Sequence, residues 1–336
     1  MIRMRRNDIS EMKGIVQRLP SVSVVIPCYN VERYVAQTVR SVLSQSYAPE
    51  DILCVDDGST DNTLNVLNRM KSSGAPITVL SQTNQGGNPA RNVGLNAVDS
   101  EYVQFLDSDD VLKPSKLEHQ ASIVARTHPK PDFIAAAYEK ELEDKGYDGK
   151  AGERGVNPDP WRGLITIGLG ITSSNLWRTA ALRGVGGWNV DYHKSQEYEL
   201  MYRLLKSCAV VYRDTTPLTV IRKRSDSVSN ADRAESRRVA LQLLCKIQQH
   251  LKSHGLMTEQ RKADLLYMSF MKSHQLFKDD PSTAVSMHDK LLTSEYIPRT
   301  QRYDLGRVYT AMYRIGGFRT AEAAYPLWSK LRKFLS

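Results

Sequence analysis

The chain has 336 residues, of which 41% are hydrophobic and 25% are charged, a balance that allows a packed core in one large domain with an appendage or in two domains. Its four cysteines lie far apart with no paired spacing, which argues against a disulfide framework and a zinc site and fits a reducing cytosol. The net charge of +9 indicates an anionic partner such as a phosphate, a nucleotide or a lipid headgroup.

Residues 1–20 form a basic N-terminal arm with a short helical pattern near residues 10–18. No apolar core follows the basic residues, so the arm does not resemble a secretory signal. No run of the sequence approaches the ~18 apolar residues that suggest a transmembrane helix. We therefore expect a cytoplasmic protein, with peripheral contact at the inner face of the cell membrane as an open alternative.

Strand-like and helical patterns alternate from residue 22 to residue 106. The predicted strands are 22–26, 52–55, 77–80 and 102–106, and the predicted helices are 32–45, 63–70 and one fed by the glycine-rich loop 84–95. The first strand is β-branched and nearly all apolar, as expected for burial on both faces. We expect Pro27 to end it, since proline cannot donate to a central ladder. This βαβ series predicts a parallel sheet with ligands at the carboxyl ends of its strands.

A polar motif follows each of these four strands. Tyr29 follows the first strand, Asp57 the second and Arg91 the third, while Asp107 and Asp109 follow the fourth. Because the carboxyl ends of parallel strands share one edge of a sheet, these side chains should converge. An aromatic ring, a lone acid, a cation and a pair of carboxylates are the parts needed to hold a nucleoside diphosphate.

The fourth motif, Asp107-Ser108-Asp109-Asp110, places three carboxylates within four positions. Like charges this close repel and raise one another's pKa, so a cation among them would stabilise the cluster. Mg²⁺ and Mn²⁺ take oxygen ligands, and an extended segment points Asp107 and Asp109 to the same side. A solvated acidic turn is the alternative, because Asp and Ser are ordinary turn residues. The shared strand edge favours the metal site.

The middle of the chain continues the mixed pattern. A helix is predicted over 114–125 and a strand over 132–137, followed by a polar stretch, 139–160, that we interpret as a mobile surface loop. A second amphipathic helix over 196–205 carries acids in its first turn, where the helix dipole favours them.

From about residue 231 the sequence predicts helix after helix. The segments are 231–254, 258–277, 282–294, 299–315 and 320–334, with breaks at Gly255, Pro281, Pro298 and Gly316-Gly317. The last two segments mix Arg and Lys with large apolar residues. They are either a solvated face over a small core or a surface that docks to an anionic membrane.

Four motifs in this order resemble those of the family 2 glycosyltransferases, over residues of about 21–229. They are Ser23 to Asn30, Asp56 to Asp61, Asn84 to Gly94 with its Ala90-Arg91-Asn92, and Leu106 to Asp110. The resemblance implies a GT-A fold, with a Rossmann-like mixed sheet flanked by helices. We expect an arm at 1–20, this α/β domain at 21–229 and an α-helical C-terminal region at 230–336.

The resemblance also implies the roles of the first three motifs. Pro27, Tyr29 and Asp57 would line the nucleoside pocket, with Asp57 accepting from the base or ribose. Arg91 would lie near the diphosphate of the donor. A bracing role for Arg91, paired with an acid of its own chain, is the alternative.

The remaining site residues follow from the same resemblance. Asp107 would face the ribose or donor sugar, and Asp109 would bind a divalent cation, Mn²⁺ or Mg²⁺. Where the family usually has an acidic pair, this chain has Gln196-Glu197, so Glu197 would be the general base. Where the family often has a histidine stands Arg224, which cannot ligate a cation but can pair with phosphate.

Two of these assignments compete with simpler ones. Glu197 could be an acid that only interacts with the helix dipole, with Asp191 and Glu199 as nearby substitutes. The tryptophans could stack on sugars or pack in the core; they are Trp161, Trp177 and Trp188.

The resemblance implies an inverting, metal-dependent transfer of a sugar from a nucleotide-sugar donor, of the UDP type, to a hydroxyl of a saccharide or lipid-linked acceptor. Cell-surface polysaccharide synthesis is the expected setting. A catalytically silent sugar-nucleotide binder that scaffolds or regulates an assembly complex is the alternative. No nucleic-acid partner is expected, because no aromatic-basic strand motif accompanies the positive charge.

Overall fold

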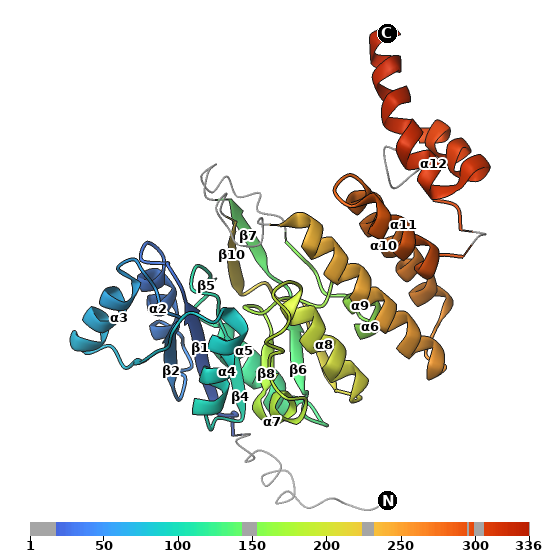
Figure 1. Ribbon diagram of the computed structural model, residues 1–336. Helices are drawn as coiled ribbons and strands as arrows, with labels where there is room; N and C mark the ends of the chain where they lie inside the picture. Colours follow the sequence, from blue (N-terminus) through green and yellow to red (C-terminus); the bar gives the residue numbers. More distant parts are fainter. Residues whose placement is uncertain (1–17, 143–152, 224–231, 294–295, 299–305, 336) are drawn as a thin grey trace, which may run out of the picture.

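The computed structural model describes residues 18–142, 153–223, 232–293, 296–298 and 306–335. A mixed sheet with helices on both faces forms the larger part of the molecule, and a helical region lies beside it (Figure 1). The predicted helix near residues 10–18 falls almost wholly outside the described residues. The expected division at residues 20 and 229 stays a prediction.

The main sheet has the strand order β3-β2-β1-β4-β8-β6-β9. The four predicted strands, β1 to β4, pair in parallel, whereas β8 runs antiparallel to both β4 and β6. The strands are β1 (Val22–Cys28), β2 (Ile52–Asp56), β3 (Thr78–Ser81), β4 (Tyr102–Phe105), β6 (Phe133–Ala136), β8 (Leu176–Arg178) and β9 (Val211–Asp214). The predicted mixed sheet is therefore confirmed.

Successive side chains of the strands enter two different cores. Val25 and Leu53 face a core shared with α4 and α8, while Val24 and Ile26 face one shared with α2 and α5. Because both faces are covered, the central strands need the apolar runs that predict them. The helices of this part are α2 (Val35–Leu43), α3 (Thr63–Ser72), α4 (Gly87–Ala97), α5 (Lys116–Arg126), α6 (Pro160–Thr166), α7 (Thr179–Gly184) and α8 (Gln196–Lys206).

Pro27 does not end the first strand, as the sequence had suggested. β1 continues to Cys28, and Pro27 pairs in register with Val55 of β2. The Val25 carbonyl accepts from the Leu106 N–H, on the side of β1 that faces β4. The backbone nitrogen of Pro27, two residues further along the strand, faces the same side. Since β4 ends at Phe105, no partner there needs a donor from Pro27.

Gly94 lets α4 lie directly on β1. A Cβ at this position would overlap the Val25 side chain, which is fully buried. The helix that follows the glycine-rich loop is therefore held against the central strand, and its first turn is carried to the carboxyl edge of the sheet.

The polar stretch after residue 138 is only partly a loop. Residues 139–142 form β7 (Glu139–Leu142), which pairs in parallel with β10 (Thr219–Lys223). β10 also pairs with β5 (Val111–Leu112), and the three strands make a second, smaller sheet. The prediction of a loop was wrong for 139–142, and residues 143–152 lie outside the described residues. Asp159 then caps α6 by accepting from the Trp161 and Arg162 N–H groups.

The predicted run of C-terminal helices is confirmed in the described ranges. The helices are α9 (Arg233–Ser253), α10 (Glu259–Phe277), α11 (Pro281–Leu291) and α12 (Gly306–Leu335). α12 is interrupted at Gly317, whose φ is 72°, at the predicted break. Pro281 begins a helix, because its missing N–H is harmless at the first position. Within the described ranges, none of the helices is both apolar enough and long enough to cross a membrane.

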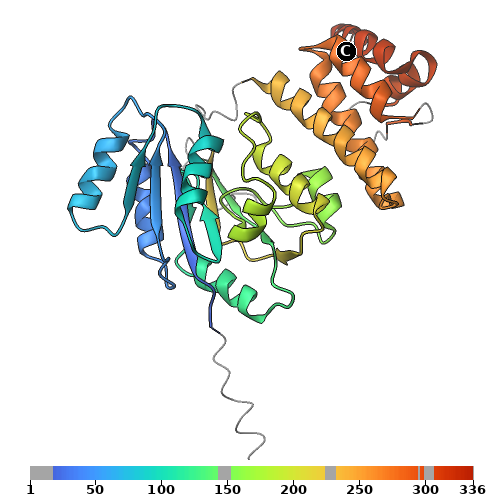
Figure 2. The same ribbon diagram turned by 60° about the horizontal axis from the view of Figure 1, so that its bottom comes forward.

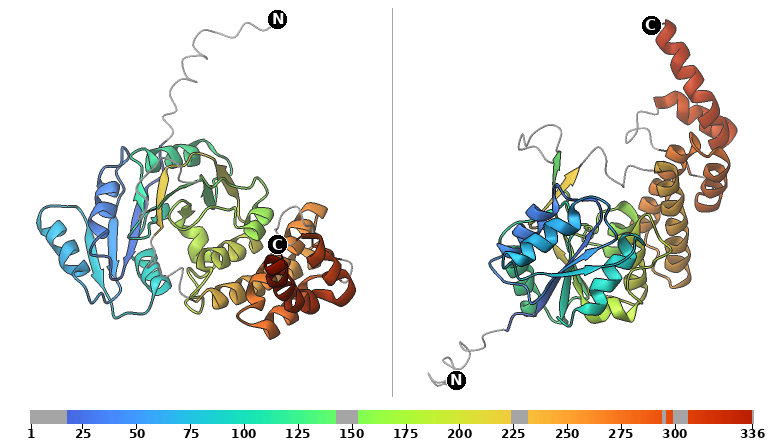
Figure 3. Two further views of the ribbon diagram at one scale, coloured as in Figure 1. Left: turned by 90° about the horizontal axis from the view of Figure 1, so that it is seen from above. Right: turned by 60° about the vertical axis from the view of Figure 1, so that its left-hand side comes forward.

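The helical region lies on the α6 and α8 side of the molecule, away from α2 and α3 (Figures 2 and 3). Two ion pairs join α6 and its cap to α10. Arg162 donates to Asp264 at 2.6 Å, and Arg261 donates to Asp159 at 2.9 Å. The helical region is thus packed on the α/β part through α10.

Candidate active site

The acidic cluster lies where β4 ends, and its most buried member is Asp110. Its carboxylate accepts from the Ser173 hydroxyl at 2.6 Å and from the Arg222 N–H at 3.2 Å. Burial raises the pKa of Asp110 well above its usual value, and the charges of Asp107 and Asp109 raise it further. Ser173 also accepts from the Asp107 N–H at 3.0 Å. Asp110 and Ser173 therefore hold the strand end in place.

Arg91 connects this strand end to two other segments. Its guanidinium donates to Asp107 at 2.7 Å, to Gln196 at 2.9 Å and to Asn88 at 3.2 Å. It also lies over the Trp188 ring, 4.8 Å from the ring centroid. Arg91 is thus paired with an acid of its own chain, as the alternative bracing role requires. The same contacts place a buried cation at the acidic edge.

Asp57 organises the glycine-rich loop. Its two oxygens accept from the Gln82 side chain at 2.7 Å, from the Gln85 N–H at 2.9 Å and from the Gly86 N–H at 2.7 Å. The carboxylate is buried, yet an ionised carboxylate has about four acceptor positions. Asp57 therefore fixes the loop and keeps capacity for a further donor.

Tyr29 is left uncovered on the same edge. Its side chain is 46% exposed, whereas Pro27 is half-buried. The next residue, Asn30, has a φ of 51° and ties the turn to the loop after β2. It accepts from the Thr60 N–H at 2.8 Å and donates its own N–H to Ser59 at 3.1 Å. An exposed ring beside a fixed loop can stack on a nucleobase.

Glu197 reaches the acidic edge from the first turn of α8. Burial raises the pKa of its carboxyl, the charge of Asp107 raises it further, and the Arg91 guanidinium lowers it. These charges act on Glu197 because they lie near it. Among the described residues, no side chain donates to the Glu197 carboxylate, and it is half-buried.

The two substitutes for Glu197 are placed differently. Glu199 is buried and binds Arg203 on the same helix, with the shortest contact at 2.8 Å from Nη2. Asp191 is exposed in the loop before α8. Glu197 has electrostatic interactions with both Arg91 and Asp107.

The acidic edge suits a divalent cation that is shared with a substrate. No group of three or more His, Cys, Asp or Glu side chains able to hold a metal occurs in the described ranges. Asp109 is half-buried, and the Asp107 side chain is 37% exposed. Mg²⁺ binds through one or two carboxylates together with substrate phosphates and water, so this donor set fits it. Arg224 lies outside the described residues.

The three tryptophans pack in the core. Trp177 is fully buried, Trp188 is 1% exposed and Trp161 is 8% exposed. The Trp188 ring meets Phe105 edge to face, with centroids 5.2 Å apart. Stacking on a sugar is therefore not a role for Trp177 or Trp188, although Trp188 supports Arg91.

Sequence reasoning missed two residues that orient the site. Ser173 is fully buried and Asn88 is 2% exposed. Asn88 donates to the carbonyls of Asn189 and Tyr192 at 2.7 and 2.9 Å. The available signal was the polar run Thr172-Ser173-Ser174-Asn175 at the end of an apolar segment.

Comparison with known proteins supports the resemblance. Residues 23–166 match the family model described as glycosyl transferase family 2. An uncharacterised glycosyltransferase of Haemophilus influenzae is 37% identical over 111 residues, which are 33% of this chain and 44% of the relative. A chondroitin synthase of Pasteurella multocida is 27% identical over 190 residues, 56% of this chain and 19% of the relative.

A putative teichuronic acid biosynthesis glycosyltransferase of Bacillus subtilis is 43% identical over 102 residues, 30% of this chain and 40% of the relative. The chain thus spans less than half the length of these curated relatives.

Solved structures share the fold. S. aureus TarS 1–349 in complex with UDP-GlcNAc has a TM-score of 0.56 at 18% identity, covering 91% of this chain and 92% of that one. The mannosyltransferase PcManGT from Pyrobaculum calidifontis, with GDP-Man and Mn²⁺, has a TM-score of 0.51 at 17% identity, covering 93% and 88%. The chain has the GT-A fold, and the likeness extends into the helical region.

Proposed function

We propose that the chain is an inverting glycosyltransferase, because residues 23–166 match the family model described as glycosyl transferase family 2. It moves a sugar from a nucleotide-sugar donor, of the UDP type, to a hydroxyl of a saccharide or lipid-linked acceptor. The relatives named chondroitin synthase and teichuronic acid biosynthesis glycosyltransferase support a role in cell-surface polysaccharide synthesis.

The donor binds along the carboxyl edge of the main sheet. Tyr29 stacks on the base, with Pro27 beside it, and Asp57 accepts from the base or the ribose through its remaining capacity. Arg91 lies close to the diphosphate and, through its 2.7 Å contact, orients Asp107 toward the ribose or donor sugar. Arg224 is proposed to pair with a phosphate oxygen.

Asp109 would hold the divalent cation, Mn²⁺ or Mg²⁺. When bound, this ion offsets the negative charge that builds on the departing nucleoside diphosphate. Asp110 takes no part as a ligand in this scheme, because Ser173 and the Arg222 N–H already occupy its oxygens.

Glu197 is the general base. Because its pKa is raised, the Glu197 carboxylate is a stronger base than an ordinary carboxylate. It would lie beside the acceptor hydroxyl. As the hydroxyl attacks the anomeric carbon, its proton passes to Glu197 and the bond to the nucleoside diphosphate breaks. A positioned base contributes roughly 10²–10⁴-fold. A single displacement of this kind inverts the anomeric configuration and needs no enzyme nucleophile.

One observation supports this proposal more than any other. Residues from three distant segments, Arg91, Asp107 and Glu197, interact at the edge where GT-A enzymes act. The test is metal-dependent hydrolysis and transfer with a panel of UDP-, GDP- and dTDP-sugars. Donor binding with no turnover over the whole panel would support the catalytically silent scaffold instead. The neutral Gln196, which stands where the family usually has an acid, is the feature that favours this alternative.

The acceptor side suggests a membrane surface. On α12, Ile315 is 89% exposed and Leu327 is 70% exposed. Exposed arginines accompany them at positions 307, 314 and 319. Large apolar side chains among cations are the features of a segment that lies on an anionic bilayer.

The exposed charged residues described on α12 are arginines, so the surface charge there is positive. Glu322 is the sole acidic residue of 306–335, and it is buried against α10. There it accepts from the Tyr309 hydroxyl at 2.6 Å and contacts His274 at 2.6 Å. We therefore propose peripheral contact of α12 with anionic lipid, where a lipid-linked acceptor would reside.

A further inference from the structure

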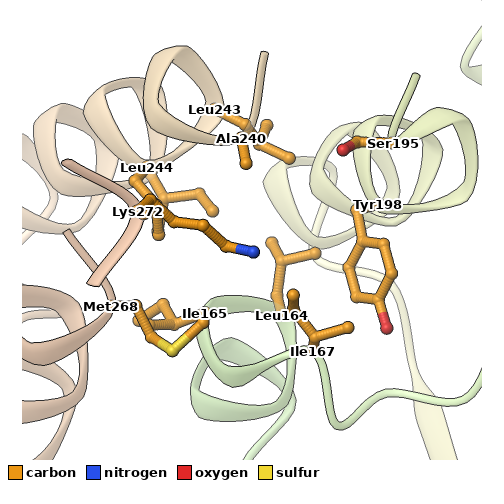
Figure 4. A pocket seen from close by; sticks show the side chains of 11 residues that line it. Leu164, Ile165, Ile167, Ser195, Tyr198, Ala240, Leu243, Leu244, Met268 and Lys272 are labelled. Carbon is orange, nitrogen blue, oxygen red and sulfur yellow. The ribbon is translucent and has the colours of Figure 1, made fainter. Parts of the chain in front are cut away.

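A pocket lies between the α/β part and the helical region, outside the site described above. Its volume is about 40 Å³, room for roughly three water molecules. Four helices supply its walls: α6, α8, α9 and α10. Figure 4 shows the side chains that line it, with Leu164 and Ile165 below, Ala240, Leu243 and Leu244 above, and Tyr198 at one side.

The walls are almost wholly apolar. Among the lining residues, Leu164, Leu244 and Tyr198 are buried. The Tyr198 hydroxyl is already engaged with the Gly170 carbonyl at 3.2 Å. Such a lining favours hydrocarbon, because each apolar surface removed from water stabilises a complex.

One charged group enters this apolar space. The amino group of Lys272, on α10, points into the pocket (Figure 4). Within the described ranges no acid forms an ion pair with it, and the charge that acts on it is that of another cation, Arg237. Burial lowers the pKa of Lys272, and Arg237 lowers it further. Lys272 is half-buried, so water solvates its ammonium only in part, and an anion beside it would stabilise the charged form.

The rim of the pocket is held in uncommon backbone conformations. Ile167 has a φ of 59° and Ser195 a φ of 53°, and the first is a β-branched residue for which positive φ is rare. Ile167 is also 45% exposed at the rim. Strain of this kind persists where surrounding structure enforces it, and it is common at ligand sites.

From this combination we propose that the pocket binds an alkyl carboxylate, with the carboxylate on Lys272 and the adjoining carbons among Leu164, Leu244 and Tyr198. One ammonium matches one negative charge, whereas a phosphate monoester carries close to two at neutral pH. The Ser195 hydroxyl, which also lines the pocket, is a further donor. The chain beyond the first few carbons leaves past Ile167.

The occupant would contact both parts of the molecule at once. Ser195 and Tyr198 belong to the start of α8, the same turn that carries Glu197, while Lys272 belongs to the helical region. This site does not depend on the proposed sugar transfer, and binding to it is measured without any donor or acceptor.

The test is calorimetric titration of the full chain with propanoate, butanoate, hexanoate and octanoate. Affinity should rise by about fourfold for each CH₂ that enters the pocket and then level off once the pocket is full. Hexanol and hexyl phosphate serve as matched ligands, and both should bind at least tenfold more weakly than hexanoate.

Two variants test the site. Lys272→Met keeps the length of the side chain and should weaken hexanoate by about tenfold or more, with no preference left over hexanol. Ala240→Leu should fill the pocket and abolish binding. Lys278→Met, at an exposed position just after the same helix, is the control that should bind as the unmodified chain does.

Three outcomes would overturn the proposal. They are no binding of hexanoate at millimolar concentration, equal binding of hexanol and hexanoate, and unchanged hexanoate affinity in a folded Lys272→Met chain. Tighter binding of hexyl phosphate would overturn the assignment of a carboxylate. Each result is independent of whether the chain transfers sugar.

Discussion

Arg91 and Asp107 form an ion pair that is closed on one side and open on the other. The Arg91 side chain is 9% exposed, whereas the Asp107 side chain is 37% exposed, and their contact is 2.7 Å. The arginine therefore fixes the carboxylate from behind without covering it. This arrangement lets Asp107 meet a ligand in one orientation.

Replacing Arg91 with Lys should damage the site more than the retained charge suggests. A lysine cannot reproduce the forked contacts to Asp107, Gln196 and Asn88. We expect kcat/KM to fall by about 10- to 100-fold, the value of one or two charge-assisted bonds. Steady-state transfer assays check this, with Arg126→Lys, an exposed position at the end of α5, as control. An Arg91→Lys chain as active as that control would contradict the assignment.

Glu197→Gln should abolish transfer while leaving donor binding intact. It should also raise the thermal midpoint at neutral pH. Because the folded-state pKa of Glu197 lies above its ordinary value, this group stabilises the fold at low pH and the contribution is lost as pH rises. A permanently neutral amide avoids that loss. Calorimetry and donor titration test both parts, and retained turnover would remove Glu197 as the base.

The acid limb of the pH–rate profile should respond to Gln196. A base must be unprotonated, so activity should rise as pH rises through the elevated pKa of Glu197. Gln196→Glu places an anion on Arg91 and reduces its ability to lower that pKa. The acid limb should therefore move to higher pH. Gln37→Glu, which adds the same charge at an exposed site on α2, should leave the limb in place, and an identical profile for both variants would contradict this account.

Gly94→Ala should destabilise the fold by about 1–3 kcal/mol, the usual cost of overpacking. The added methyl group would overlap Val25 on the central strand. Gly184→Ala is the matched control, since a Cβ there meets nothing within 4 Å. Chemical denaturation of both variants measures the difference. Equal stability would mean that α4 does not rest on β1 as closely as described.

Membrane contact by α12 can be measured with vesicles. Burying Ile315 or Leu327 in a bilayer is worth roughly 1.5–3 kcal/mol each, so the Ile315→Glu, Leu327→Glu double variant should lose most of its sedimentation with anionic liposomes. Neutral liposomes should bind the unmodified chain weakly, because about 1 kcal/mol per nearby arginine is then absent. Unchanged sedimentation of the double variant would exclude this surface.

The sequence predicts much of the sheet because most of its strands have a clear apolar pattern in their own residues. The apolar segments at β1, β2 and β4 satisfy two cores at once, and each is followed directly by its polar motif. β7 is different, since Glu139-Lys140-Glu141 looks like a solvated loop. Its strand conformation comes from pairing with β10, about which the local pattern carries no information.

The sequence predicted which candidate site residues come together better than it predicted their contacts. Motif order and the family resemblance placed Arg91, Asp107 and Glu197 near one another, as the structure does. They did not show that Arg91 is bound to Asp107 or that Asp57 holds the loop. Ser173 was missed because the polar run that contains it, residues 172–175, does not show which of its members contacts the acidic edge. Its role follows from two partners, Asp107 and Asp110, that lie on another strand end.

The orientation of Asp107 by Ser173 has a consequence for modularity. The two residues are separated by 66 positions, Arg91 and Gln196 by 105, and Asp110 and Arg222 by 112. The segment that carries the family motifs, residues 23–166, therefore contains none of the three outer partners. A fragment limited to that segment would hold Asp107 and Asp109 but would lack both Glu197 and the residues that orient the acidic edge. The part of the chain that matches the family model is therefore shorter than the part that builds the candidate site.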